Sequence, residues 1–162
     1  MKGDKIRRSN SSYKGLYRPK NTHKYRGDVT ACFYRSLWER RFMVFCDENS
    51  SVIEWSSEEV IVPYVSPIDG KFHRYFVDFY VKVKSTDEKT KVYLIEVKPK
   101  SQTKQPEPPK TKKTSKSKIA EMRNWIINNA KWSAARSLCE DKGWEFKILT
   151  EENLFSGSGE GL

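Results

Sequence analysis

The chain has 162 residues and carries 31 basic against 21 acidic side chains, a formal net charge of +10. This length suits one domain with one core, and the positive surplus indicates a polyanionic partner, most often nucleic acid, although a basic protein kept soluble by its charge is an alternative. Because no apolar run approaches the roughly 20 residues that cross a bilayer, we expect no membrane partner and a cytoplasmic site of action.

Three cysteines, Cys32, Cys46 and Cys139, are widely spaced and odd in number. The chain has no CxxC pair, and His23 and His73 are too isolated to complete a zinc site. The cysteines are therefore predicted to be small buried or half-buried thiols in a reducing compartment.

Residues 1–30 are basic and aromatic but poor in aliphatic side chains, so this segment cannot bury much surface on its own. It either packs over the domain or forms an arm that contacts phosphates. We set the domain itself at residues 31–155. A helix is expected over 36–48, because Ser36 and Glu39 have the spacing of a capping box.

Strands are expected next. Short runs at 52–55 and 60–64 are followed by a turn at 67–70 that ends in Asp-Gly. A long run over 74–83 and a second over 91–98 are rich in aromatic and β-branched residues. These two runs are predicted to pair antiparallel at the centre of a sheet.

Residues 99–118 are dominated by Lys, Pro, Thr, Ser and Gln, which predicts a mobile basic loop within the domain. A helix over 119–141 should follow, then a strand over 144–149. The helix has an apolar stripe made of Ile119, Met122, Trp125 or Ile126, Trp132 and Leu138. The Gly/Ser-rich residues 156–162 are predicted to form a flexible tail.

The residues that indicate chemistry are Asp78 on one long run and Glu96-Val97-Lys98 at the end of the next. Alternate strand residues share a face, so Glu96 and Lys98 should point the same way while Val97 points oppositely. Carboxylates brought together in an apolar sheet repel each other unless a cation joins them, and Mg²⁺ prefers oxygen ligands of this kind. The alternative is a structural ion pair, in which Asp78 is paired with an arginine or with Lys98.

Val77-Asp78 with Glu96-Val97-Lys98 resembles the PD-(D/E)xK nuclease motif, with Val77 in the position of the usual proline. The resemblance implies an α/β fold: a single domain with a restriction-endonuclease-like mixed β-sheet flanked by helices. In the TnsA-like branch an acid from the preceding helix joins the site, and Glu39 is the matching position. The capping-box interpretation of Glu39 competes with that role.

Several ordered motifs between residues 13 and 155 are similar to the head-completion nucleases of T-even-type tailed phages. They are Tyr17-Arg18-Pro19-Lys20-Asn21, Tyr34-Arg35-Ser36-Leu37-Trp38-Glu39-Arg40, Trp55-Ser56-Ser57-Glu58-Glu59, Arg74-Tyr75-Phe76-Val77-Asp78-Phe79, Glu96-Val97-Lys98-Pro99-Lys100 and Ile148-Leu149-Thr150-Glu151-Glu152. This resemblance implies a DNA endonuclease and exonuclease that processes packaged DNA during head completion and head–tail joining. It further implies capsid portal or neck proteins as partners, with action in the host cytoplasm and retention in the virion as an alternative.

By the same resemblance, Asp78, Glu96 and the Val97 carbonyl hold Mg²⁺, with Mn²⁺ as a substitute. Glu39 would bind the same ion, a second ion or an ordered water, and Lys98 would orient or deprotonate the attacking water. The basic loop, the N-terminal segment and five further residues are expected to grip DNA with little base specificity. These five are Arg35, Arg40, Arg41, Arg74 and Lys100.

Two rival functions remain at this stage. A non-catalytic head or neck assembly protein could use the nuclease fold only to bind DNA, although clustered buried acids at Asp78 and Glu96 would then have no purpose. A DNA-cleaving subunit of a transposition complex would instead require specific end sequences and a partner protein. Metal-dependent cleavage separates a nuclease from the non-catalytic protein. A requirement for specific end sequences separates the transposition subunit from the head-completion nuclease.

Overall fold

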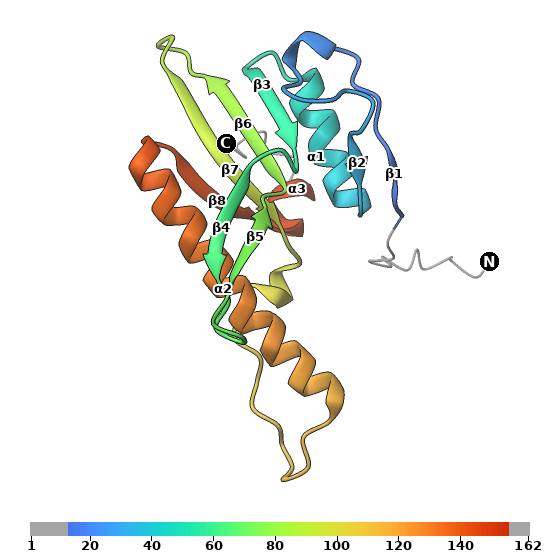
Figure 1. Ribbon diagram of the computed structural model, residues 1–162. Coiled ribbons are helices and arrows are strands. Elements are labelled where there is room, and N and C mark those ends of the chain that lie inside the picture. The colour runs from blue at the N-terminus through green and yellow to red at the C-terminus, as the bar shows by residue number, and fades with distance from the viewer. Residues whose placement is uncertain (1–12, 156–162) are drawn as a thin grey trace, which may run out of the picture.

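The structure is a computed structural model that describes residues 13–155. Residues 1–12, which belong to the predicted arm, and the predicted tail over 156–162 lie outside the described residues. The chain forms a mixed α/β domain in which helices flank a β-sheet (Figure 1). This confirms the predicted fold class.

The elements follow one another from short N-terminal strands to a C-terminal helix. The strands are β1 (Gly15–Leu16), β2 (Phe33–Tyr34), β3 (Val52–Ser57), β4 (Ile61–Val65), β5 (Phe72–Phe76), β6 (Phe79–Lys84), β7 (Thr90–Val97) and β8 (Glu145–Leu149). The helices are α1 (Leu37–Glu48), α2 (Lys116–Lys142) and α3 (Glu151–Phe155), with 3-10 turns η1 (Thr22–Lys24) and η2 (Lys100–Gln102).

The main sheet has the strand order β3-β6-β7-β8. The first two pairings, β3 with β6 and β6 with β7, are antiparallel, whereas β8 pairs parallel to β7. The predicted antiparallel pair at the centre of the sheet is therefore confirmed for β6 and β7. Their register places Phe79 opposite Ile95, so Asp78 and Glu96 lie at the same end of neighbouring strands.

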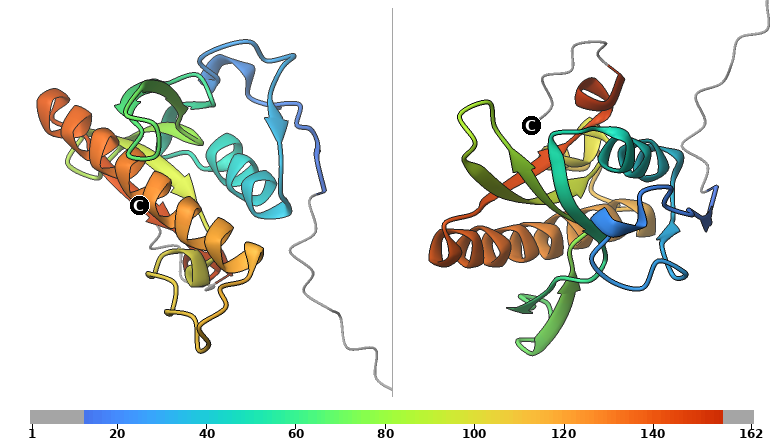
Figure 2. Two further views of the ribbon diagram at one scale, coloured as in Figure 1. Left: turned by 60° about the horizontal axis from the view of Figure 1, so that its bottom comes forward. Right: turned by 90° about the horizontal axis from the view of Figure 1, so that it is seen from above.

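Each face of this sheet is covered by a different set of elements (Figure 2). On one face, α1 and the N-terminal segment bury alternate residues of β6 and β7, among them Phe79, Val81 and Ile95. On the other face, α2 and the β4–β5 hairpin bury Tyr80 and Leu94. The two-residue period of the strands thus divides the core into two layers, and Glu96 has the parity of Leu94 on the α2 side.

The run predicted as one strand over 74–83 is two strands in the structure. The strand is interrupted at Val77-Asp78, and we call this interruption the break. Before it, β5 pairs with β4 in a separate two-stranded sheet, whereas β6 after it belongs to the main sheet. Backbone hydrogen bonds stabilise the break, because Val77 N donates to Val60 O and Glu58 N donates to Asp78 O. The sequence pattern missed the break because residues on both sides of it are equally suited to a strand.

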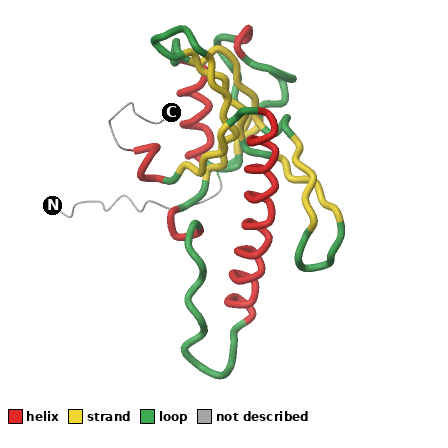
Figure 3. Tube along the Cα trace, turned by 90° about the vertical axis from the view of Figure 1, so that its left-hand side faces the viewer, coloured by secondary structure: helices red, strands yellow, loops and turns green. Residues whose placement is uncertain are grey.

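Helix α2 is longer than expected, and only its C-terminal half packs fully against the sheet. Trp132, Ala135 and Cys139 are buried, whereas Ile119 and Ile126 are 56% and 38% exposed. The predicted stripe is therefore wrong for Ile119, and of the two alternatives Trp125 packs while Ile126 does not. The first turns of α2 extend away from the sheet together with the basic loop (Figure 3), and Ile119 lies there, before the point where Trp125 begins to pack on the domain.

The N-terminal segment belongs to the domain from residue 13 onward, so the predicted boundary at residue 30 lies too far along the chain. Tyr17 and Tyr25 are both 7% exposed and contact the Trp55 ring in the core. Aromatic rings supply the buried surface that the scarce aliphatic side chains of this segment do not.

A buried carboxylate, Asp47 near the end of α1, holds this segment in place. It accepts hydrogen bonds from Tyr17 Oη at 2.7 Å, Lys20 N at 2.8 Å and Asn21 N at 2.9 Å. Burial raises the pKa of Asp47, but these donors outweigh it and the net pKa lies below the ordinary value. The folded state therefore favours the ionised form of the Asp47 carboxylate.

The three cysteines are free and buried, as predicted. Burial raises the pKa of Cys32 to about 11, so this thiol stays protonated at neutral pH. None of the helices in residues 13–155 is long and apolar enough to cross a membrane.

We predict that Asp47→Asn destabilises the protein by about 1.5–3 kcal/mol at pH 7, because an amide cannot accept all three hydrogen bonds. The folded pKa of Asp47 is depressed, so its contribution is complete above the unfolded pKa of about 4 and is lost as pH falls through the folded value. Urea unfolding should therefore show a difference in the free energy of unfolding between wild type and variant that is smaller at pH 3 than at pH 7. The exposed control Glu140→Gln should change unfolding at neither pH, and an equal difference at both would contradict the prediction.

Candidate functional site

Asp78 occupies the break between β5 and β6, where the chain passes from one sheet to the other. Its Oδ2 accepts a hydrogen bond from Val97 N at 2.8 Å, which joins it to the last residue of β7. Because Asp78 O also accepts from Glu58 N, side chain and backbone are both held. The residue is half-buried, and these hydrogen bonds fix its carboxylate in position.

Glu96 lies on β7 and is 4% exposed. Its Oε1 forms an ion pair with Lys98 Nζ at 3.2 Å, and its Oε2 accepts a short hydrogen bond from the Tyr75 hydroxyl. The shared face predicted for Glu96 and Lys98 is confirmed by this ion pair. Lys98 follows the last residue of β7 and its side chain is 27% exposed, so its ammonium remains partly accessible to solvent beside the buried glutamate.

The negative charge is incompletely balanced at this site. The pKa of Asp78 lies well above the ordinary value, because burial disfavours the charged form and the Glu96 and Glu39 carboxylates add negative potential. Lys98 and the Val97 amide act in the opposite direction without cancelling it. Two carboxylates that crowd each other in this way are a donor set that suits a hard divalent cation such as Mg²⁺.

Glu39 lies in the first turn of α1 and acts in the helix cap. Its backbone N donates to Ser36 Oγ at 3.2 Å, and its Oε2 accepts from Arg35 N at 3.0 Å. Burial raises the pKa of Glu39 above its ordinary value. Its charge is felt at Asp78, but among residues 13–155 no three Asp, Glu, His or Cys side chains converge closely enough to hold a metal ion. The structure therefore brings Asp78 and Glu96 together and leaves Glu39 beside them in the cap.

Two of the residues predicted to bind DNA are paired with carboxylates. Arg35 Nε lies 3.0 Å from Glu58 Oε1, and this partner raises the pKa of the guanidinium further. Lys100 Nζ pairs with Glu152 on α3. These ion pairs are exposed, so they contribute little stability and a phosphate can compete for either cation.

The other three predicted DNA-binding residues are exposed. Arg40 and Arg41 lie on α1, where the Arg41 guanidinium stacks 4.6 Å from the Phe155 ring centre. Arg74 lies on β5, 5.7 Å from the Phe76 ring centre. Within residues 13–155 none of the three forms an ion pair.

Tyr75 and Glu58 are the site residues that the sequence did not assign. Tyr75 lies two residues before the break and holds Glu96, but with 74–83 treated as one strand nothing pointed to that contact. Glu58 sits within a family-like motif and has a left-handed backbone, with φ of 55°. A non-glycine residue in this conformation is strained and is frequent near functional sites.

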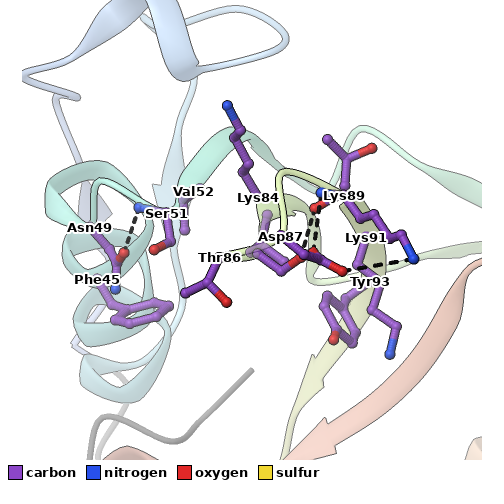
Figure 4. Close-up of a pocket in the computed structure, with 13 residues that line it drawn as sticks. Phe45, Asn49, Ser51, Val52, Lys84, Thr86, Asp87, Lys89, Lys91 and Tyr93 are labelled. Atoms are coloured by element: carbon purple, nitrogen blue, oxygen red, sulfur yellow. Dashed lines mark hydrogen bonds and ion pairs between the residues drawn. The ribbon is translucent and has the colours of Figure 1, made fainter.

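A separate pocket of about 680 Å³ lies at the opposite end of the sheet (Figure 4). It is lined by Lys84 at the end of β6, Asp87 in the turn that follows and Lys91 on β7, together with Phe45 of α1. Its Lys84 lies five residue steps along β6 from Phe79 beside the carboxylates, a distance of about 17 Å. This pocket is therefore distinct from the acidic site and has no carboxylate pair.

The fold and the site together define an endonuclease family. The TnsA-like endonuclease N-terminal family matches residues 49–151. This match spans the main sheet, Asp78, Glu96 and the whole of α2, and the chain belongs to this family. The mixed sheet flanked by helices is accordingly the predicted restriction-endonuclease-like fold.

A particular relative is similar over nearly its whole length. The chain is 41% identical over 145 residues to the head completion nuclease of Enterobacteria phage T4, covering 88% of this chain and 94% of the relative. The aligned part therefore includes nearly all of the described domain. The resemblance predicted from the motifs is confirmed.

We predict that the cap and the chemistry at Glu39 can be separated by mutation. Glu39→Gln keeps an oxygen acceptor for Arg35 N, so stability should change by less than about 0.5 kcal/mol, while loss of the charge should lower DNA cleavage at least tenfold. Ser36→Ala should do the reverse, costing about 1 kcal/mol of stability and leaving cleavage intact. Unfolding curves and cleavage rates of both variants decide the matter, and a Glu39→Gln protein with normal cleavage would assign Glu39 to the cap alone.

Proposed function

We propose that this protein hydrolyses DNA phosphodiester bonds with a divalent metal ion at Asp78 and Glu96. The nuclease role in phage head completion follows from the endonuclease family and from the T4 relative. The observation that supports the metal-dependent mechanism is the fixed pair of carboxylates whose charge the surrounding residues do not balance. A protein that only bound DNA would gain nothing from this buried repulsion.

In this mechanism Asp78, Glu96 and the carbonyl of Val97 would hold Mg²⁺, with Mn²⁺ as a substitute. The ion would polarise the scissile phosphate and stabilise the negative charge that develops in the transition state. Glu96 is kept in position by Tyr75 on one oxygen and Lys98 on the other. Asp78 is kept in position by the Val97 amide, so the ligands are preorganised rather than gathered on binding.

Lys98 is the group best placed to act on the attacking water. Its ammonium lies 3.2 Å from Glu96 Oε1 and remains partly exposed, so it can reach a water beside the scissile phosphate. Glu39 adds a second carboxylate near Asp78, in a helix cap that fixes its direction. Its proposed role is to hold a water or a second ion, because it does not join the Asp78–Glu96 pair directly.

The basic loop between η2 and α2 is proposed to grip the DNA backbone. Its lysines at 104, 110, 112 and 113, and Lys116 at the start of α2, are exposed and form no ion pair within the described part of the chain. Arg40, Arg41 and Arg74 add cations nearer to the carboxylates. Lysine contacts phosphate as a point charge, so we expect weak sequence preference.

We further propose that the protein acts on packaged DNA in the host cytoplasm during head completion and that a portal or neck protein recruits it. Retention in the virion is a further part of the proposal. A transposition subunit is the second candidate, because the matching family carries the TnsA name. Cleavage that needs specific end sequences would favour it.

Cleavage of linear and supercoiled DNA with Mg²⁺ and with EDTA tests the central proposal. Asp78→Asn and Lys98→Gln should each lower the cleavage rate at least 100-fold, because each removes a preorganised charge at the reacting phosphate. Circular dichroism checks folding, and Lys89→Gln at the far end of the sheet should cleave normally. A folded wild-type protein that binds DNA but cuts it with neither Mg²⁺ nor Mn²⁺ would contradict the nuclease mechanism and leave an assembly role.

The salt dependence of binding tests the basic loop. We predict that replacing Lys110, Lys112 and Lys113 together by glutamine lowers the slope of log Kd against log salt by about 2–3, roughly one per lost phosphate contact. Fluorescence anisotropy between 50 and 200 mM salt measures it. Lys84→Gln and Lys89→Gln, which remove lysines already paired with acids, should leave the slope unchanged. An unaltered slope in the triple variant would exclude the loop from the DNA contact.

A further inference from the structure

The β4–β5 hairpin has one buried face and one exposed face. Val62, Tyr64 and Tyr75 point inward and pack with α2. The opposite side, which we call the hairpin outer face, consists of six exposed residues. They are Ile61, Pro63 and Val65 on β4 and Phe72, Arg74 and Phe76 on β5.

The pairing register makes the hairpin outer face one continuous surface. Phe76 lies opposite Ile61 and Phe72 lies opposite Val65, with Arg74 between them. Phe72 is 80% exposed and Phe76 is 43% exposed. Single exposed apolar residues are ordinary, but a continuous row of them marks an interaction surface.

The strand that carries Phe72 and Phe76 leads directly into the active site. Phe76 is separated from Asp78 only by Val77, and Tyr75 reaches Glu96 from the other side of the same strand. From Asp78 the hairpin extends in the same general direction as the basic loop (Figure 1). A DNA strand that passes Asp78 and continues along β5 would reach the two phenylalanines, which lie about 13 Å apart along that strand.

We infer that the hairpin outer face binds unpaired bases of a DNA strand whose backbone lies at the Asp78–Glu96 site. The inference rests on the proposed nuclease function and adds a substrate class, single-stranded or frayed DNA. In a duplex the flat faces of the bases are hidden in the stack, whereas an unpaired base offers its π-face to an aromatic side chain. Phe72 and Phe76 provide two such platforms.

Charge favours DNA over an apolar protein partner on this surface. The Arg74 guanidinium lies at the centre of the face and stacks on Phe76, and no acidic side chain within residues 13–155 pairs with it. It is thus free to contact a phosphate between two stacked bases. The formal charge of +10 attracts the same polyanion.

The test uses fluorescence anisotropy in EDTA. It compares the binding of a fluorescein-labelled single DNA strand with the binding of a blunt-ended DNA duplex. Phe72→Ala and Phe76→Ala should each weaken single-strand binding about 5- to 100-fold, so that the ratio of single-strand to duplex affinity falls. Phe72→Trp should restore the ratio, whereas Phe72→Leu should not. Phe33→Ala is the matched control: Phe33 is 56% exposed on β2, apart from the hairpin (Figure 1), and its loss should leave the ratio unchanged.

Two outcomes overturn the inference. If Phe72→Ala and Phe76→Ala bind both DNA forms as wild type does, the face does not bind bases. If Phe72→Leu binds single strands as tightly as Phe72→Trp, the contact is apolar rather than stacking, which would suit a protein partner. Because binding is measured without metal, these results stand apart from cleavage: a wild-type enzyme that cuts DNA while the variants bind normally refutes only this inference.

Discussion

The arrangement of the site depends on the position where the chain leaves one sheet for another at Val77-Asp78. Backbone hydrogen bonds from Val77 N to Val60 O and from Glu58 N to Asp78 O hold this break. Because β5 is freed from the main sheet there, it packs on α2 and brings Tyr75 to Glu96. The side chain of Asp78 meanwhile accepts the Val97 amide. The interruption at Val77-Asp78 thus holds both carboxylates in place and closes the base of the β4–β5 hairpin.

The same arrangement brings the negative charges of Asp78 and Glu96 close together, which is electrostatically unfavourable. Burying Asp78 beside Glu96 raises its pKa, which means that the ionised pair destabilises the folded state relative to isolated carboxylates. Asp47 shows the opposite case, since its donors lower the pKa and make its ionised form stabilising. Asp47 and the Asp78–Glu96 pair both lie within the fold. Only the Asp78–Glu96 pair has too few hydrogen-bond donors and cations to balance its negative charge. This contrast is what separates a structural carboxylate from one available to bind a cation.

The sequence predicted the relations that strand and helix periods determine. Alternation along β7 placed Glu96 and Lys98 on one face, and the capping box placed Glu39 at the start of α1. It did not predict the break, because Phe76-Val77-Asp78-Phe79 fits a strand throughout. The contact of Tyr75 with Glu96 depended on that break. The stripe of α2 failed at Ile119 for a related reason: a period identifies an apolar face but not which neighbour, if any, covers it.

The distribution of ion pairs explains where the surplus of positive charge acts. At the far end of the sheet, Lys84, Lys89 and Lys91 each have an acidic partner, so their charges are largely compensated. The lysines at 110, 112 and 113 and Arg74 form no ion pair within residues 13–155. These cations lie where the basic loop and the hairpin extend beyond the sheet (Figure 3). Their positive field therefore adds to the attraction of a polyanion toward the end of the sheet that carries Asp78 and Glu96.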